Sequence, residues 1–236
     1  MASGDVAVSM LVFVSVVLLC EAARILLRSA PLANSALAVH AVEFVSTLQL
    51  CCCTHELKLL SEVGRVEPRL SLTLTYVACV VHGLTFGGAL GNACGAIERA
   101  CSGRLAGRCA LRRVTCQIAA AGVARAVVVP RVWALGLSDL HRRHTLLGFR
   151  CVSQIRAPLP LAAAVECAGA FCVQTAVSRT LALQDKYRVH AIAAVVTTLV
   201  YAGMLMSVLM FRTVIPMLWP TSGPTPYRPL ETKKGK

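Results

Sequence analysis

Three groups of residues in this sequence could handle a solute or do chemistry. The stretch GGALGNACGAIERA, residues 87–100, places Asn92 at a glycine-rich break between an apolar run and a short helix-like segment. Two acids, Glu43 and Glu166, lie inside apolar runs, and the stretch CCCTHE, residues 51–56, brings thiols and an imidazole together. These groups point respectively to solute contact, to charged groups inside a membrane, and to metal binding.

Metal binding is disfavoured at the CCCTHE stretch. Three adjacent cysteines point in different directions on a helix and cannot easily surround one ion. Cysteine also packs as a small hydrophobic residue, and the 12 cysteines lie mostly in or beside apolar runs, with no CxxC pair. We therefore expect no metal, no cofactor and no disulfide framework. No nucleophile has a base at a useful spacing, so the sequence does not indicate an enzyme.

The composition indicates a membrane protein. The 236 residues are 56% hydrophobic and 15% charged, with a mean hydropathy of +0.68, which leaves too little charge to cover a soluble domain. Crossing hydrocarbon takes about 20 apolar residues in a helix. Six regions approach or exceed that length, the last nearly long enough for two short helices: 6–27, 36–53, 70–90, 117–137, 159–182 and 189–219. Because apolar and polar residues do not alternate regularly, the sequence predicts an all-α, multi-pass transmembrane helical bundle.

The net charge of +13 fits membrane topology better than nucleic-acid binding, because only 5% of the residues are aromatic. Five arginines in the connection after Asn92 mark it as cytosolic: Arg99, Arg104, Arg108, Arg112 and Arg113. The basic tail over 221–236 also indicates the cytosol. The arginines between residues 142 and 156 lie in the next connection, however, and make the rule that positive charge marks the cytosolic side ambiguous. We expect the lipid bilayer as a partner and no nucleic acid.

The two acids suggest an internal duplication. An ionised carboxylate in the bilayer is costly, so Glu43 and Glu166 should face a bundle interior or an aqueous path and have partners. Both follow Ala-Val, and each precedes, after a connection, another long apolar run. Two halves with an acid at the corresponding place are what a duplicated transport fold would have. The alternative is two unrelated helices that each tolerate a glutamate.

The break at Asn92 fits a re-entrant segment. Broken helices are tolerated at membrane depth where their backbone lines a cavity or is buried in protein, and Gly87, Gly88 and Gly91 permit a sharp turn. Asn92 can cap a short helix that begins near Ala93, and the N-terminus of that helix carries a partial positive charge. Such a site would hold water or a neutral hydroxylic molecule and oppose cations and protons.

These residues resemble the aquaporin family. The stretch LTLTYVACVVHGLTFGGALGNAC is similar to the family's second helix and first pore loop, with Asn92, Ala93 and Cys94 at the place of the Asn-Pro-Ala signature. Cysteine at the third position, the stretch LQLCCCTHELKLLSE and an additional N-terminal hydrophobic segment are similar to the unorthodox superaquaporin branch. Residues 187–203 resemble the family's fifth core helix and residues 204–211 its last one. The resemblance covers nearly the whole chain.

The resemblance implies an intracellular channel for passive transport of water and small neutral solutes such as glycerol and hydrogen peroxide. It also implies assembly as a homo- or hetero-tetramer, with Gly91 to Cys94 in the pore motif and with Glu43 and Glu166 holding loops or helices. Lys233 and Lys234, fourth and third from the end, match a dilysine retrieval signal. Together with the family's known residence, that signal implies the endoplasmic reticulum.

Two departures from the family pattern matter. Ala93 replaces the signature proline, which predicts a looser loop. The chain's only asparagines are Asn34 and Asn92, so the second Asn-Pro-Ala motif and the arginine beside it have no counterpart. Arg212 lies in an apolar run that resembles the last helix, and we do not assign it that role. The alternative function is therefore a non-conducting shortened isoform that acts as a membrane interaction subunit.

The expected division of the chain follows from these features. It comprises an additional N-terminal segment over 1–30, a first repeat over 31–137 with the pore loop at 87–100, a shortened second repeat over 138–220 and a cytosolic tail over 221–236. The first run could instead be a signal peptide cleaved near Ala22, but the segment before it carries Asp5 and no lysine or arginine, whereas signal peptides start with basic residues. If 189–219 forms one helix and not two, the tail falls on the opposite side of the membrane.

Overall fold

The computed structural model describes residues 3–29, 36–62, 66–146 and 159–209, and these residues form helices joined by short connections. The chain divides into two compact units, Met1–Thr197 and Thr198–Lys236. Of the second unit the structure describes only the end of the last helix. In chain order the helices are α1 (Ser3–Ser29), α2 (Ala36–Glu62), α3 (Pro68–Thr85), α4 (Ala93–Cys101), α5 (Gly107–Val123), the π-helix η1 (Ala124–Val128), α6 (Val129–Ala134), α7 (Asp139–Leu146), α8 (Leu159–Arg179) and α9 (Asp185–Leu209).

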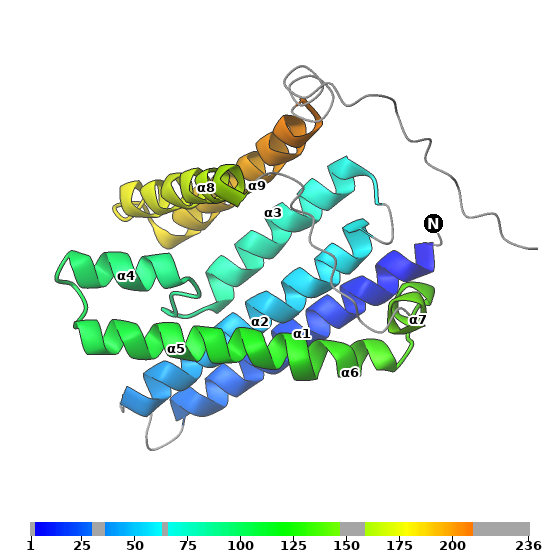
Figure 1. Cartoon of the computed structure of the whole chain (residues 1–236). Coiled ribbons are helices and arrows are strands. Elements are labelled where there is room, and N and C mark those ends of the chain that lie inside the picture. Colours follow the sequence, from blue (N-terminus) through cyan, green and yellow to red (C-terminus); the bar gives the residue numbers. More distant parts are fainter. Residues whose placement is uncertain (1–2, 30–35, 63–65, 147–158, 210–236) are drawn as a thin grey trace, which may run out of the picture. The chain divides into compact units, whose positions relative to one another are not determined.

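Helix α2 is the central element of the first unit. It packs along α1 and also contacts α3, α5 and η1, as Figure 1 shows for the blue and cyan helices and the green helix beside them. Cys52, Leu59 and Leu60 of α2 form a core cluster with Trp133 of α6 and Leu140 of α7. The cysteines of the CCCTHE stretch therefore lie on a helix, where Cys52 and Cys53 pack as core residues.

Among the residues that the structure describes, four helical stretches are long and apolar enough to cross a membrane: Gly4–Ser29, Leu37–Ser61, Gly107–Ala134 and Leu159–Arg179. They confirm the predicted all-α, multi-pass membrane bundle, because the residues that the structure describes include no strand. Of the expected run over 189–219, the described part is one continuous helix up to Leu209. Its remainder, including Arg212, lies outside the described residues.

One predicted connection is shorter than expected. Arg108, Arg112 and Arg113 were expected in the connection after Asn92, but they lie on α5, which begins at Gly107. Arginine, alanine and leucine are good helix formers, so the helix begins at Gly107, about three turns before the apolar run that starts at Gln117. The connection between α4 and α5 is reduced to Ser102–Ala106.

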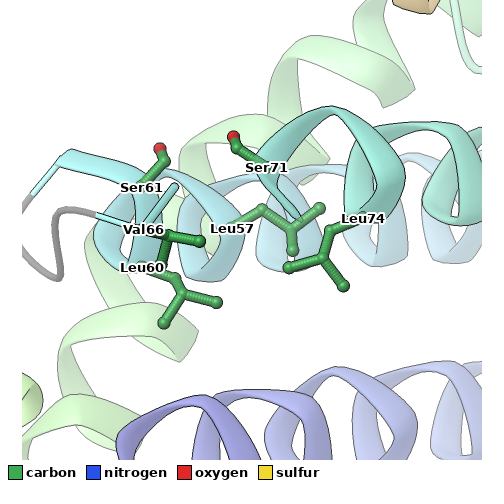
Figure 2. Close-up of a pocket in the computed structure, with 6 residues that line it drawn as sticks. All are labelled: Leu57, Leu60, Ser61, Val66, Ser71 and Leu74. Carbon is green, nitrogen blue, oxygen red and sulfur yellow. The ribbon is translucent and has the colours of Figure 1, made fainter. Parts of the chain in front are cut away.

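A small pocket lies where α2 and α3 meet, lined by Leu57, Leu60, Ser61, Val66, Ser71 and Leu74. Figure 2 shows the side chains of Leu57 and Leu74 approaching each other between the two helices. The volume of the pocket, about 10 Å³, is enough for about one water molecule, and leucine and valine make up most of its wall. This pocket is a packing gap and not a solute site.

Candidate pore-loop site

The loop between α3 and α4 depends on glycine. Helix α3 ends with the N–H of Phe86 donating to the carbonyl of His82 at 3.0 Å. Gly87, Gly88 and Gly91 follow with φ of 57°, 92° and 61°, a conformation that residues with a side chain rarely adopt. A Cβ on Gly91 would also lie 2.6 Å from Cε2 of the Phe86 ring. The sequence GGALG thus supplies the turn that returns the chain toward α4.

Asn92 caps α4, as the sequence predicts. Its backbone is extended, with φ −143° and ψ 127°, and its Oδ1 accepts a hydrogen bond from the N–H of Cys94 at 2.9 Å. Alanine at position 93 is accepted as the first residue of the helix. Because the cap engages only the amide oxygen, the N–H₂ group of the exposed Asn92 side chain is the donor that a solute can meet.

Glu43 of α2 binds the loop just before Asn92. Its fully buried carboxylate accepts hydrogen bonds from the N–H of Leu90 at 3.1 Å and from the N–H of Gly91 at 2.8 Å. It also accepts from Arg113 Nη1 at 2.9 Å and from Gln117 Nε2 at 2.7 Å, both on α5. One carboxylate therefore joins α2, the loop and α5, and Arg113 compensates its charge.

Glu166 has different surroundings. It is exposed on α8, and none of the described residues of α8 is buried. Within the described part of the chain its side chain makes no hydrogen bond or ion pair. The expectation of an inward-facing acid with a partner is therefore met at Glu43 and not at Glu166. The physical difference is that Glu43 lies beside a loop whose N–H groups, at Leu90 and Gly91, donate to its carboxylate.

Sequence reasoning missed several polar residues around the loop. Arg113 was expected in a connection and Gln117 was not singled out, although the spacing of four residues places both on one face of a helix. Arg24 of α1 was also missed, and its side chain is fully buried. The rule that an ionisable residue inside an apolar run needs a partner, which singled out Glu43, would have found it.

A pocket of about 260 Å³ lies beside the turn that precedes Asn92. Apolar side chains, two guanidinium groups and the loop itself line it: Leu27, Arg28, Ala38, Val39, Val42, Gly87, Gly88, Ala89 and Arg113. The space beside the loop is thus large enough for small molecules, and positive charge borders it. Lys233 and Lys234 of the expected retrieval signal lie outside the described residues.

Comparison with known proteins gives one consistent result. Aquaporin-11 from Equus caballus is 37% identical over 199 residues, covering 84% of this chain and 72% of the relative. Aquaporin-11 from Homo sapiens is 36% identical over 202 residues with the same coverage of 84% and 72%, and Aquaporin-12 from Mus musculus is 31% identical over 200 residues, covering 83% and 68%.

No protein-family profile and no solved structure matches the chain. The similarity to these relatives nevertheless extends over most of both sequences, and it confirms the resemblance read from the residues around Asn92. The chain belongs to the aquaporin family.

Proposed function

We propose that this chain is an intracellular channel that passes water, together with small neutral solutes such as glycerol and hydrogen peroxide, along a path beside Asn92. Family membership and the four candidate spans make it an integral, multi-pass membrane protein of the aquaporin channel type, and not an enzyme. The observation that carries the proposal is the attachment of the loop. Glu43 binds the N–H groups of Leu90 and Gly91, directly before Asn92.

The chemistry of the loop suits a neutral solute. The amide N–H₂ of Asn92 can donate to the oxygen of water or of an alcohol, while its Oδ1 stays in the cap of α4. The N-terminus of α4 carries a partial positive charge, and the guanidinium groups of Arg28 and Arg113 line the adjacent pocket. These positive groups disfavour the entry of cations and protons.

A second candidate function is a non-conducting shortened isoform that acts as a membrane interaction subunit. The chain has two asparagines, Asn34 and Asn92, so a second Asn-containing pore motif has to come from elsewhere. Helix α8 offers a specific reason to consider this function. Its described surface is unburied, with Leu159, Val165 and Phe171 all exposed, and such a surface suits lipid or a partner subunit.

Stopped-flow shrinkage of proteoliposomes separates the two functions. Vesicles that hold the purified chain are compared with empty vesicles under a sucrose gradient for water and under a glycerol gradient for glycerol, with a peroxide-sensitive dye inside for hydrogen peroxide. A channel gives water flux above that of empty vesicles. Flux equal to that of empty vesicles for all three solutes supports the interaction subunit.

Location and assembly are part of the proposal. Lys233 and Lys234 support residence in the endoplasmic reticulum. Their joint replacement by serine should then raise the fraction of the chain at the cell surface, measured by surface biotinylation, and no change would argue against the signal. A homo- or hetero-tetramer predicts four copies in native mass spectrometry of the complex.

A further inference from the structure

We infer that helix α1, the additional N-terminal segment, positions the pore loop through a buried relay that starts at Arg24. The inference concerns the geometry of the loop, and its consequence for transport rests on the proposed function. The relay runs from α1 through α2 to the end of α3, which leads directly into the loop. Its steps are side-chain hydrogen bonds as far as His82 and Thr85, ring stacking from His82 to Phe86, and packing of the Phe86 ring against Gly91 at the end.

Arg24 lies in the apolar run of α1, yet its side chain is fully buried. Its Nε and Nη2 donate to the carboxylate of Glu21 at 2.9 and 2.7 Å. Nη2 also donates to Oε1 of Gln49 on α2 at 2.7 Å, and Nη1 lies 3.5 Å from Oγ of Ser46. A charge buried in a membrane span usually serves a function and has a partner. Here the partner charge comes from α1 itself, and the remaining donors face α2.

Gln49 carries the relay to α3. Its amide oxygen accepts from Arg24, and its Nε2 donates to Nδ1 of His82 at 3.0 Å and to Oγ1 of Thr85 at 3.0 Å. Both hydrogens and the oxygen of the amide are therefore engaged, which fixes its orientation. Because Arg24 requires the oxygen on its side, the amide must present its N–H₂ group to the last turn of α3.

His82 and Thr85 lie where α3 turns into the loop. The carbonyl of His82 accepts from the N–H of Phe86, and the rings of His82 and Phe86 stack with centroids 5.4 Å apart. The Phe86 ring in turn lies against Gly91, where an added Cβ would come within 2.6 Å of it. The relay thus ends at Gly91, the residue before Asn92, whose N–H also donates to Glu43.

Arg28 provides a second link between α1 and the loop. Its Nη2 donates to the carbonyl of Gly87 at 3.4 Å. Arg24 and Arg28 are one helical turn apart, so both project from one face of α1. Two arginines of α1 therefore act on the loop, one through Gln49 and one directly.

Amide hydrogen exchange of the full-length chain in nanodiscs tests the inference without requiring conduction. The N–H groups of Leu90 and Gly91 are hydrogen-bonded to Glu43, so their exchange reports opening of the loop. Arg24→Met, Gln49→Leu and the double variant are compared with the wild type, with Arg131→Met as a matched control at an exposed arginine of another span. Helix α7, held to the far part of α2 by the Glu56–His141 contact, is the internal reference for global stability.

We expect Arg24→Met to speed exchange over residues 86–92 on the order of tenfold, as for the loss of one charge-assisted hydrogen bond, while α7 is unchanged. Arg24→Lys, which keeps one charged donor, should recover part of the protection. Gln49→Leu should reproduce the effect, and the double variant should add little to it because both residues belong to one relay.

Three results would overturn the inference: unchanged exchange over 86–92, an equal increase in α7 that marks general destabilisation, or additive effects in the double variant. Water flux is measured on the same preparations. If the wild type shows no flux but the exchange pattern is selective, the positioning role stands and the proposed function fails. If the wild type conducts water and exchange over 86–92 is unchanged in the variants, the proposed function stands and the positioning role of α1 fails.

Discussion

At the scale of single residues, the site depends on one carboxylate. Glu43 accepts hydrogen bonds from two loop N–H groups and from two side chains of α5, and it is shielded from solvent. Removing one partner of a buried ion pair leaves the other charge uncompensated, which costs far more than losing a surface pair. Glu43 is therefore the acceptor that ties the loop to both α2 and α5.

Replacing Glu43 by glutamine tests how much this carboxylate contributes to the stability of the protein. Glu43→Gln removes the charge that compensates Arg113 and turns one acceptor into a donor, so we expect the free energy of unfolding to fall by about 3–5 kcal/mol. Thermal unfolding of the micelle-solubilised protein, followed by circular dichroism, measures the change. Glu67→Gln is the matched control, because the Glu67 side chain is 71% exposed and its contact with Arg69 is 3.9 Å long. Equal stability of the two variants would show that Glu43 does not anchor the loop.

Glycine substitutions test the conformation of the loop. At Gly91, where φ is 61°, an alanine would be strained and its Cβ would also meet the Phe86 ring. At Gly88, where φ is 92°, an alanine would be strained but its Cβ would lie in open space. Gly122→Ala, within α5 and also in open space, should stabilise its helix by about 1 kcal/mol. We expect the thermal midpoint to rise for Gly122→Ala, fall for Gly88→Ala and fall further for Gly91→Ala. A Gly91→Ala midpoint at or above that of the wild type would be incompatible with the described turn.

At the scale of elements, the apolar runs predicted the helices but not their ends. The helix in the run over 70–90 ends at Thr85, two residues before Gly87, and α5 begins ten residues before the apolar run that starts at Gln117. Hydropathy measures apolar content, whereas a helix end depends on capping groups and on helix-forming polar residues such as arginine. The capping role of Asn92 was predictable because its side chain acts locally. The relay through Arg24 was not, because it depends on how three helices pack.

The first helix gives a prediction at this scale. Helix α1 runs without interruption from Ser3 to Ser29, and the segment that resembles a cleavage site lies inside it. Cys20 is buried and Glu21 is bound to Arg24, so removing this part would strip α2 of its main neighbour. We expect the protein purified from cells to retain residues 1–29, detected as intact N-terminal peptides by mass spectrometry. A mature N-terminus at residue 23 would contradict the role given to α1.

At the scale of the whole molecule, the sequence predicted the class of protein better than the likeness of its two halves. Low charge and long apolar runs led directly to a helical membrane protein, and the residues around Asn92 led to the aquaporin family. The two halves are less alike than the repeated Ala-Val-Glu tripeptide indicated. Glu43 has a loop to bind, whereas Glu166 is exposed on α8. A tripeptide records local sequence, and only the surrounding fold decides whether an acid finds donors.

The central claim for the whole molecule is that water passes beside the loop at Asn92. The most direct test is stopped-flow water flux through proteoliposomes that hold the Asn92→Asp variant. The aspartate keeps an oxygen for the N–H of Cys94, so the cap of α4 is preserved, while the donor N–H₂ group becomes an anionic acceptor. We predict that water flux through the wild type and the Glu67→Gln control exceeds that of empty vesicles. The flux through Asn92→Asp should be at least about tenfold lower than that of the wild type, with an unchanged thermal midpoint. Wild-type flux retained in Asn92→Asp would contradict a water path beside this residue.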